Sequence, residues 1–155
     1  MKKILFVCLG NICRSAMAKY VFEDMVKKAG LEHLFVVDSA GTSDEEHGNP
    51  IYPPARKKLA EHGIVVESHS ARQVRVGDYL RFDYIVAMDS NNLRDLMRVF
   101  GDDPEGKISL LLNHVPTNDK EHYGRSVADP WFTRNFDQAY EDIVVGCTAL
   151  LEEWR

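Results

Sequence analysis

Residues 7–15 read Val7-Cys8-Leu9-Gly10-Asn11-Ile12-Cys13-Arg14-Ser15. The apolar run Ile4-Leu5-Phe6-Val7 leads into this stretch, and residues 16–23 after it favour a helix. The order strand, tight loop, helix places the loop at a helix N-terminus. Unpaired N–H groups and the positive end of the helix dipole bind anions there. The stretch therefore predicts an anion site at the first turn of the fold.

The loop contains residue types suited to holding a phosphate group while a thiolate attacks it. Gly10 and Asn11 tolerate the positive φ that a tight curl needs, and Arg14 offers a planar fork that matches phosphate oxygens. The nest of N–H groups would also favour the thiolate of Cys8, with Ser15 as a further donor. The predicted phosphate-binding residues are Leu9, Gly10, Asn11, Ile12, Cys13, Arg14 and Ser15.

The spacing Cys-x5-Arg alone fits a structural site equally well. A buried cysteine beside a loop arginine is common enough, because free cysteine is often buried. The strand before the loop and the helix after it favour the functional interpretation.

Length and composition indicate one globular domain, predicted to span residues 1–155. No apolar run is long enough to cross a membrane, and the run after Lys2 and Lys3 is too short for a signal peptide. The net charge of −5 argues against a nucleic-acid partner. Three cysteines without a secretory signal predict a reducing, cytoplasmic setting and no disulfide framework. Their spacing, with no matching pair of histidines, is poor for zinc.

Predicted strands and helices alternate along the chain. Strands are predicted at residues 2–8, 34–37, 83–88 and 108–112, and helices at about 15–29, 52–62, 91–100 and 136–154. The first strand-helix-strand unit implies two parallel neighbours with a right-handed crossover. Ligands bind at the C-terminal edge of open α/β sheets, so Cys8, Ser39 and Asp89 should lie on one side of the sheet.

The last helix and the loop before it complete the prediction. Residues 113–129 form a long loop, and loops of this length are usually functional or disordered. The helix presents one apolar stripe at helical spacing, on which Cys147 is predicted to be a core residue. The stripe consists of Phe136, Ala139, Tyr140, Ile143, Val144, Cys147, Leu150, Leu151 and Trp154.

The chain resembles the low-molecular-weight protein tyrosine phosphatases. Residues 8–15 match the phosphate loop of that family, including its second cysteine, and Asp129-Pro130-Trp131 matches its general-acid motif. Residues 38–42, 69–73 and 88–89 are similar to its intermediate landmarks, so the resemblance covers essentially the whole chain in order. It implies an open, twisted four-stranded parallel sheet in the order 2-1-3-4, with helices on both faces, no metal and no cofactor.

The resemblance also implies roles for residues that the spacing leaves undecided. Taken alone, His69 fits a surface histidine better than a site residue. The family resemblance suggests instead that Asn11, Ser15, Ser39 and His69 form a hydrogen-bond network that braces the loop.

The predicted pocket walls are Ile12, Trp131 and Phe132, with Glu45 where relatives often carry an aromatic residue. Ordinary packing at a helix start is an equal alternative for Trp131 and Phe132. The turn Asp44-Glu45-Glu46 fits a solvated surface turn, or a device that repels acidic substrates.

The implied reaction is hydrolysis of phosphotyrosine in protein substrates through a phosphocysteine intermediate. Cys8 would be the nucleophile, Arg14 the phosphate clamp and Asp129 the general acid and then base. Activity should follow a bell-shaped pH profile on the acid side. Cys13 either packs under the loop or traps an oxidised Cys8 as a disulfide. We expect a monomer without membrane or nucleic-acid partners, with weak self-association as an alternative.

Three other functions fit parts of this pattern. A protein-arginine phosphatase would share the loop, but the resemblance places a threonine at the position of Ile12. A thioredoxin-linked arsenate reductase would need a further relay cysteine, and only Cys147 is left. A phospho-binding module without catalysis would be expected to lack Cys8 or Asp129, and both are present.

Overall fold

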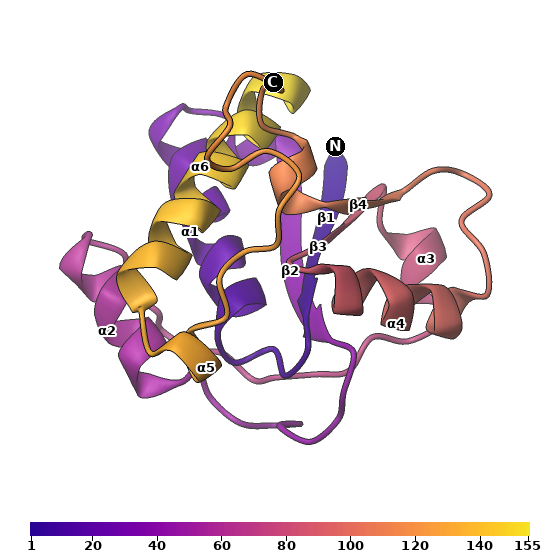
Figure 1. The fold of residues 1–155 in the computed structure, drawn as a ribbon, viewed down its shortest axis with the longest axis horizontal. Coiled ribbons are helices and arrows are strands. Elements are labelled where there is room, and N and C mark those ends of the chain that lie inside the picture. The colour runs from indigo at the N-terminus through magenta and orange to yellow at the C-terminus, as the bar shows by residue number, and fades with distance from the viewer.

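The strand β1, Lys2–Cys8, lies inside a four-stranded sheet in the computed structural model, which describes residues 1–155. The sheet order is β2-β1-β3-β4, with every neighbouring pair parallel (Figure 1). The other strands are β2 (Phe35–Gly41), β3 (Tyr84–Ala87) and β4 (Ile108–Leu110). The predicted α/β class and strand order are confirmed. No helix is both long and apolar enough to cross a membrane.

Helices cover both faces of the sheet (Figure 1). Side chains alternate along β1, so Ile4 and Phe6 pack into one core while Leu5 and Val7 pack into another. The first core lies under α1 (Arg14–Lys28), α2 (Pro53–Glu61) and α6 (Phe136–Trp154). The second, smaller core lies under α3 (Asp78–Arg81) and α4 (Ser90–Phe100). Burial on both faces explains why β1 is apolar without alternation.

The last helix packs as its apolar stripe predicts. Six of the stripe residues are buried, and Cys147 is fully enclosed, which confirms it as a core residue. Burial raises the pKa of the Cys147 thiol, so it stays protonated. The main contact of α6 is with α1, the helix that follows the phosphate loop. This contact holds the C-terminal part of the chain against the N-terminal unit.

Two short segments differ from the prediction. The strand predicted at 108–112 ends at Leu110, and Leu111–Asn113 forms a 3₁₀ turn, η2. Leu111 turns onto α6 at Gly146, where an added Cβ would lie 2.4 Å from Leu111 Cγ. The apolar sequence was therefore right about burial and wrong about the type of element. The turns α3 and α5 (Pro130–Thr133), and the 3₁₀ turn η1 (Glu32–Leu34), were not predicted.

Candidate active site

The loop between β1 and α1 curls around Asn11. Asn11 is buried and has φ of 62°, one of two non-glycine residues with positive φ. Its side-chain amide donates to Ser15 Oγ at 2.8 Å and to Ser39 Oγ at 2.9 Å. Its Oδ1 accepts from the backbone N–H of Arg72 at 3.1 Å. An L-residue is strained at this φ, and these three bonds hold it there.

His69 completes the brace on the far side of the loop. Its Nε2 lies 2.6 Å from the carbonyl oxygen of Asn11, and because a carbonyl only accepts, Nε2 carries the proton. Burial lowers the pKa of His69, although the bond to Asn11 opposes the shift, so the neutral ring is favoured. The surface interpretation of His69 is therefore wrong. The structure does bring Asn11, Ser15, Ser39 and His69 together.

Cys8 lies at the end of β1 with its sulfur turned into the loop. Its Sγ is 3.0 Å from Ser15 Oγ and accepts from the N–H of Asn11 at 3.3 Å. The residue is only 3% exposed, yet it lines the cavity described below. Hydrogen bonds to a sulfur favour its charged form. Cys8 is therefore placed as a thiolate nucleophile at the floor of a cavity.

Arg14, the first residue of α1, is buried beside two carboxylates. Its guanidinium donates to Asp89 Oδ2 at 2.8 Å and to Asp129 Oδ2 at 3.4 Å. Burial alone would lower the pKa of Arg14, but the negative charges of Cys8, Asp129 and Asp89 raise it instead. The cation is thus fixed by its neighbours before any phosphate arrives.

Asp89 is the site residue that sequence reasoning placed but did not assign. It caps the N-terminus of α4, where its Oδ1 accepts from the N–H of Asn92 at 2.8 Å and its Oδ2 faces Arg14. The signal was its position directly after β3, at the same sheet edge as Cys8. Its partner could not be inferred, because Arg14 is 75 positions away in the chain.

Asp129 lies at the mouth of the site as the N-cap of α5. One carboxylate oxygen accepts from the N–H of Trp131 at 3.0 Å and the other faces Arg14. The side chain is 28% exposed, so a proton can reach it from solvent. An acid on a helix cap, beside a buried nucleophile, is a suitable proton donor for a leaving group.

A cavity of about 200 Å³ joins the nucleophile, the arginine and the acid. The predicted wall residues Ile12, Glu45, Trp131 and Phe132 all line it, and Ser43 and Glu46 line it without having been predicted. Phe132 is 80% exposed and Trp131 46%, so core packing does not explain them. The full lining is Cys8, Leu9, Gly10, Ile12, Cys13, Arg14, Ser43, Glu45, Glu46, Asp129, Trp131 and Phe132.

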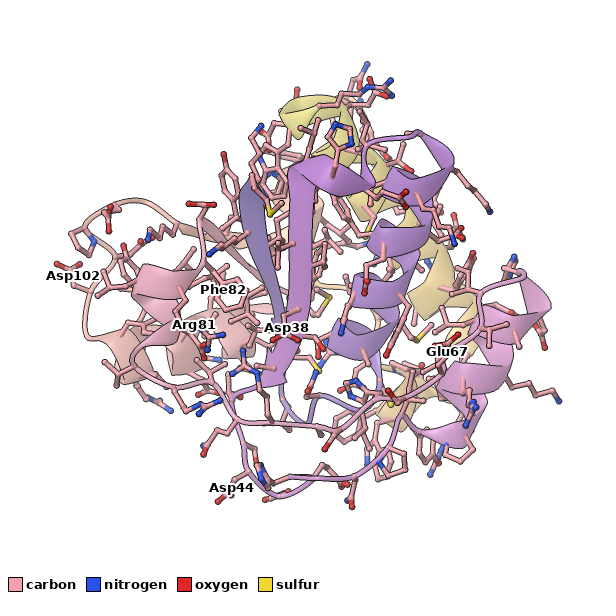
Figure 2. All side chains as sticks on the ribbon, turned by 180° about the vertical axis from the view of Figure 1, so that it is seen from behind. Asp38, Asp44, Glu67, Arg81, Phe82 and Asp102 are labelled. Carbon is pink, nitrogen blue, oxygen red and sulfur yellow. The ribbon has the colours of Figure 1, made fainter.

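The acidic turn forms one rim of this cavity. Figure 2 shows Asp44 on the loop beyond the C-terminal end of β2, well away from Glu67. Glu46 passes over Gly10, since a Cβ added at Gly10 would lie 3.3 Å from Glu46 Cγ. Glu45 and Glu46 therefore place negative charge directly beside the phosphate loop.

Cys13 lines the same cavity and is 7% exposed. Burial, followed by the negative charges of Cys8 and Asp129, raises the pKa of its thiol to about 12. The two cysteines of the loop therefore differ in kind. Cys8 has two hydrogen-bond donors at its sulfur, whereas Cys13 is held as a neutral thiol.

Known proteins share this sequence and this fold. The family model for the low molecular weight phosphotyrosine protein phosphatases matches residues 3–155. The chain is 40% identical over 151 residues to low molecular weight protein-tyrosine-phosphatase YfkJ of Bacillus subtilis, covering 97% of this chain and 94% of that protein. The crystal structure of YfkJ has a TM-score of 0.92 and covers 99% of this chain and 94% of its own.

Two further relatives come from animals. Identity to the low molecular weight phosphotyrosine protein phosphatase of Homo sapiens is 39% over 156 residues, 98% of this chain and 95% of that one. The crystal structure of a Drosophila arginine phosphatase has a TM-score of 0.85 at 32% identity, covering 100% of this chain and 98% of its own. The chain thus belongs to the low molecular weight phosphotyrosine protein phosphatase family, a family of hydrolases.

Proposed function

We propose that this chain hydrolyses phosphotyrosine in proteins through a phosphocysteine intermediate on Cys8. One observation carries the proposal: the sulfur of Cys8, the guanidinium of Arg14 and the carboxylate of Asp129 line a single cavity. Each has the chemistry of one task, which are attack, charge stabilisation and proton transfer.

In the first step the Cys8 thiolate attacks phosphorus in line with the tyrosyl oxygen. An S–P bond forms as the P–O bond breaks, and Asp129 gives its proton to the leaving oxygen. The loop N–H groups and Arg14 bind the three equatorial oxygens, where charge is spread in the transition state. Asp89 supports this role, because its bond at 2.8 Å fixes the guanidinium.

In the second step a water molecule frees the phosphate. Asp129, now ionised, takes a proton from the water, whose oxygen attacks phosphorus while the S–P bond breaks. Cys8 leaves as a thiolate, and the hydroxyl of Ser15 at 3.0 Å stabilises it. Inorganic phosphate departs and the site returns to its starting state.

The shape of the cavity supports an aryl phosphate as the substrate. Cys8 lies at its floor, while Trp131 and Phe132 stand exposed at its mouth. A flat ring can lie between such walls with its phosphate on the loop. A phosphoserine, whose phosphate is one carbon from the backbone, reaches less far.

A protein-arginine phosphatase is the second candidate. Glu45 and Glu46 line the cavity and would attract the guanidinium that carries the phosphate in phosphoarginine. Ile12 supports the aryl substrate instead, since its branched apolar side chain suits a ring.

Hydrolysis of matched phosphotyrosine, phosphoserine and phosphoarginine peptides by the parent and by Cys8→Ser tests the proposal. We expect the phosphotyrosine peptide to have the highest kcat/KM and Cys8→Ser to be inactive on all three. Activity that survives in Cys8→Ser would contradict the mechanism. A preference for phosphoarginine would favour the second candidate.

We also propose that Cys13 protects Cys8 from irreversible oxidation. Peroxide would convert the Cys8 thiolate to a sulfenic acid, and the Cys13 sulfur would then attack it to form an S–S bond and release water. The raised pKa of Cys13 opposes this attack while Cys8 is charged. Oxidation of Cys8 to the neutral sulfenic acid removes that charge, so the trap opens when it is needed.

For the setting, we propose a monomer in the cytoplasm that acts on phosphotyrosine proteins. Three free cysteines suit a reducing compartment. The net charge of −5 disfavours nucleic acid as a partner.

A further inference from the structure

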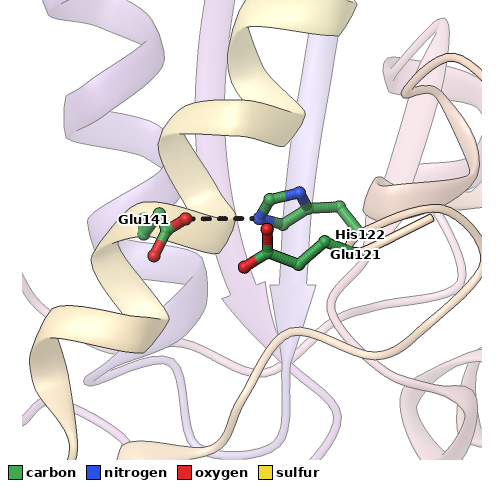
Figure 3. A group of neighbouring side chains, drawn as sticks. All are labelled: Glu121, His122 and Glu141. Carbon is green, nitrogen blue, oxygen red and sulfur yellow. Dashed lines mark ion pairs between the residues drawn. The ribbon is translucent and has the colours of Figure 1, made fainter. Parts of the chain in front are cut away.

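A cluster of possible metal ligands lies outside the catalytic cavity. Glu121 and His122 belong to the loop between η2 and α5, and Glu141 belongs to α6. One ligand atom from each lies within 4.8 Å of the others. Figure 3 shows both carboxylates turned toward the ring of His122. None of the three lines the cavity above Cys8.

His122 is the unusual member of this cluster. It is 5% exposed, and its Nε2 is a buried polar atom without any hydrogen-bond partner. Buried polar atoms in folded proteins nearly always have a partner. The Nε2 atom therefore calls for a ligand, and it faces the cluster.

Asp119 orients the ring for this role. Its carboxylate oxygens lie 2.9 Å and 3.0 Å from Nδ1 of His122. A carboxylate accepts, so Nδ1 carries the proton and Nε2 of the neutral ring keeps its lone pair. Histidine that binds a metal commonly has such a carboxylate at its other nitrogen.

The distances fit ligands around an ion better than a hydrogen bond. Nε2 of His122 lies 3.5 Å from Glu141 Oε1. Two ligands at 2.0–2.2 Å from a tetrahedral zinc ion are about 3.4 Å apart. Asp142 is also near, at 3.9 Å, but Arg125 binds both of its oxygens, so Asp142 is already neutralised.

We propose that Glu121, His122 and Glu141 bind one divalent transition-metal ion, for which Zn²⁺ is the best match, with Asp119 as the positioning residue. One imidazole and two carboxylates form a common zinc ligand set, and water would fill the fourth position. The ion takes no part in catalysis. It ties the loop that leads to Asp129 onto α6, beside the bond from the N–H of Ala128 to Asp142 at 3.0 Å.

Calorimetric titration with ZnCl₂ and thermal unfolding of the full chain test this proposal. Both are done in a Cys8→Ser background, because the catalytic thiolate could also bind zinc. We expect one bound ion and a rise in Tm that saturates with it. Glu121→Gln and Glu141→Gln, both at exposed positions, should weaken binding by more than about tenfold, and Asp119→Asn by about 10–100-fold. Glu152→Gln, an exposed acid on the same helix, should change neither quantity.

His122→Gln should abolish binding, and the two glutamate variants keep the test valid if that variant does not fold. Two results would overturn the proposal. One is the absence of heat and of any Tm shift in the parent, which is the outcome if His122 is simply protonated and paired with Glu141. The other is zinc affinity that stays the same in Glu121→Gln and Glu141→Gln.

Discussion

The end of β2 touches the phosphate loop so closely that Gly41 leaves no room for a side chain beside Leu9. A Cβ at Gly41 would lie 2.6 Å from the carbonyl oxygen of Leu9 and 3.2 Å from the backbone nitrogen of Asn11. The N–H groups of Thr42 and Ser43 donate to the carbonyls of Cys8 and Leu9 just beyond. The second strand is therefore part of the mould that shapes the loop.

Gly41→Ala should distort that mould. The clash is with backbone, which cannot rotate away, so we expect kcat/KM to fall at least about tenfold and the free energy of unfolding to drop by about 1–3 kcal/mol. Steady-state kinetics and urea unfolding measure the two effects. Gly77→Ala, with open space around it, should change neither. Gly146→Ala, which clashes with Leu111, should lower stability and leave the kinetics of the folded protein intact.

Asp129→Asn should remove the proton donor while leaving the nucleophile in place. We expect kcat for phosphotyrosine peptides to fall by about 10²–10⁴-fold. The loss should shrink for aryl phosphates with more acidic leaving groups, because those leave without a proton. Rates across a series of aryl phosphates measure this trend. An equal loss across the series would rule out the proton-donor role.

His69 should make stability depend on pH. Burial places its pKa in the folded protein below the ordinary value of 6.5, so the unfolded chain binds the proton more readily. Its contribution is complete above about pH 6.5 and is lost as the pH falls toward the lowered pKa. Urea unfolding at pH 7.5 and 5.5 should thus show a larger loss in the parent than in His69→Gln. An identical loss in both proteins would contradict the assignment.

The rim carboxylates should select the charge of the substrate. Phosphotyrosine peptides with basic flanking residues should have a higher kcat/KM than acidic ones, and added salt should reduce the difference by screening. Glu45→Gln and Glu46→Gln should reduce it as well. Glu67→Gln, exposed and remote from the cavity, serves as the matched control. If Glu45→Gln and Glu67→Gln behave alike, the rim has no role in selection.

Cys13→Ala should make peroxide damage permanent. After a pulse of peroxide and then dithiothreitol, the parent should recover most of its activity and Cys13→Ala little, because its sulfenic acid oxidises further. Cys147→Ala controls for the loss of a thiol elsewhere. Full recovery of Cys13→Ala would show that Cys13 only packs.

The sequence was most informative where the chemistry is local. The stretch from Cys8 to Ser15 contains nucleophile, nest and clamp within one turn, so spacing alone indicated the site. The brace on Arg14 from Asp89 escaped prediction because it joins residues 75 positions apart. The 3₁₀ turn at Leu111 escaped it because an apolar run reports burial, and the gap at Gly146 decided the local shape.

The contact between Arg14 and Asp129 joins residues 115 positions apart. The segment that ends in Asp129 reaches the phosphate loop only when α6, at the end of the chain, has docked on α1. A chain still emerging from the ribosome can form the thiolate loop long before it owns an acid to work with it. Non-local contacts of this kind form late and slowly. Catalytic turnover is therefore a reporter of completed folding, and recovery of activity during refolding should lag behind the formation of helix.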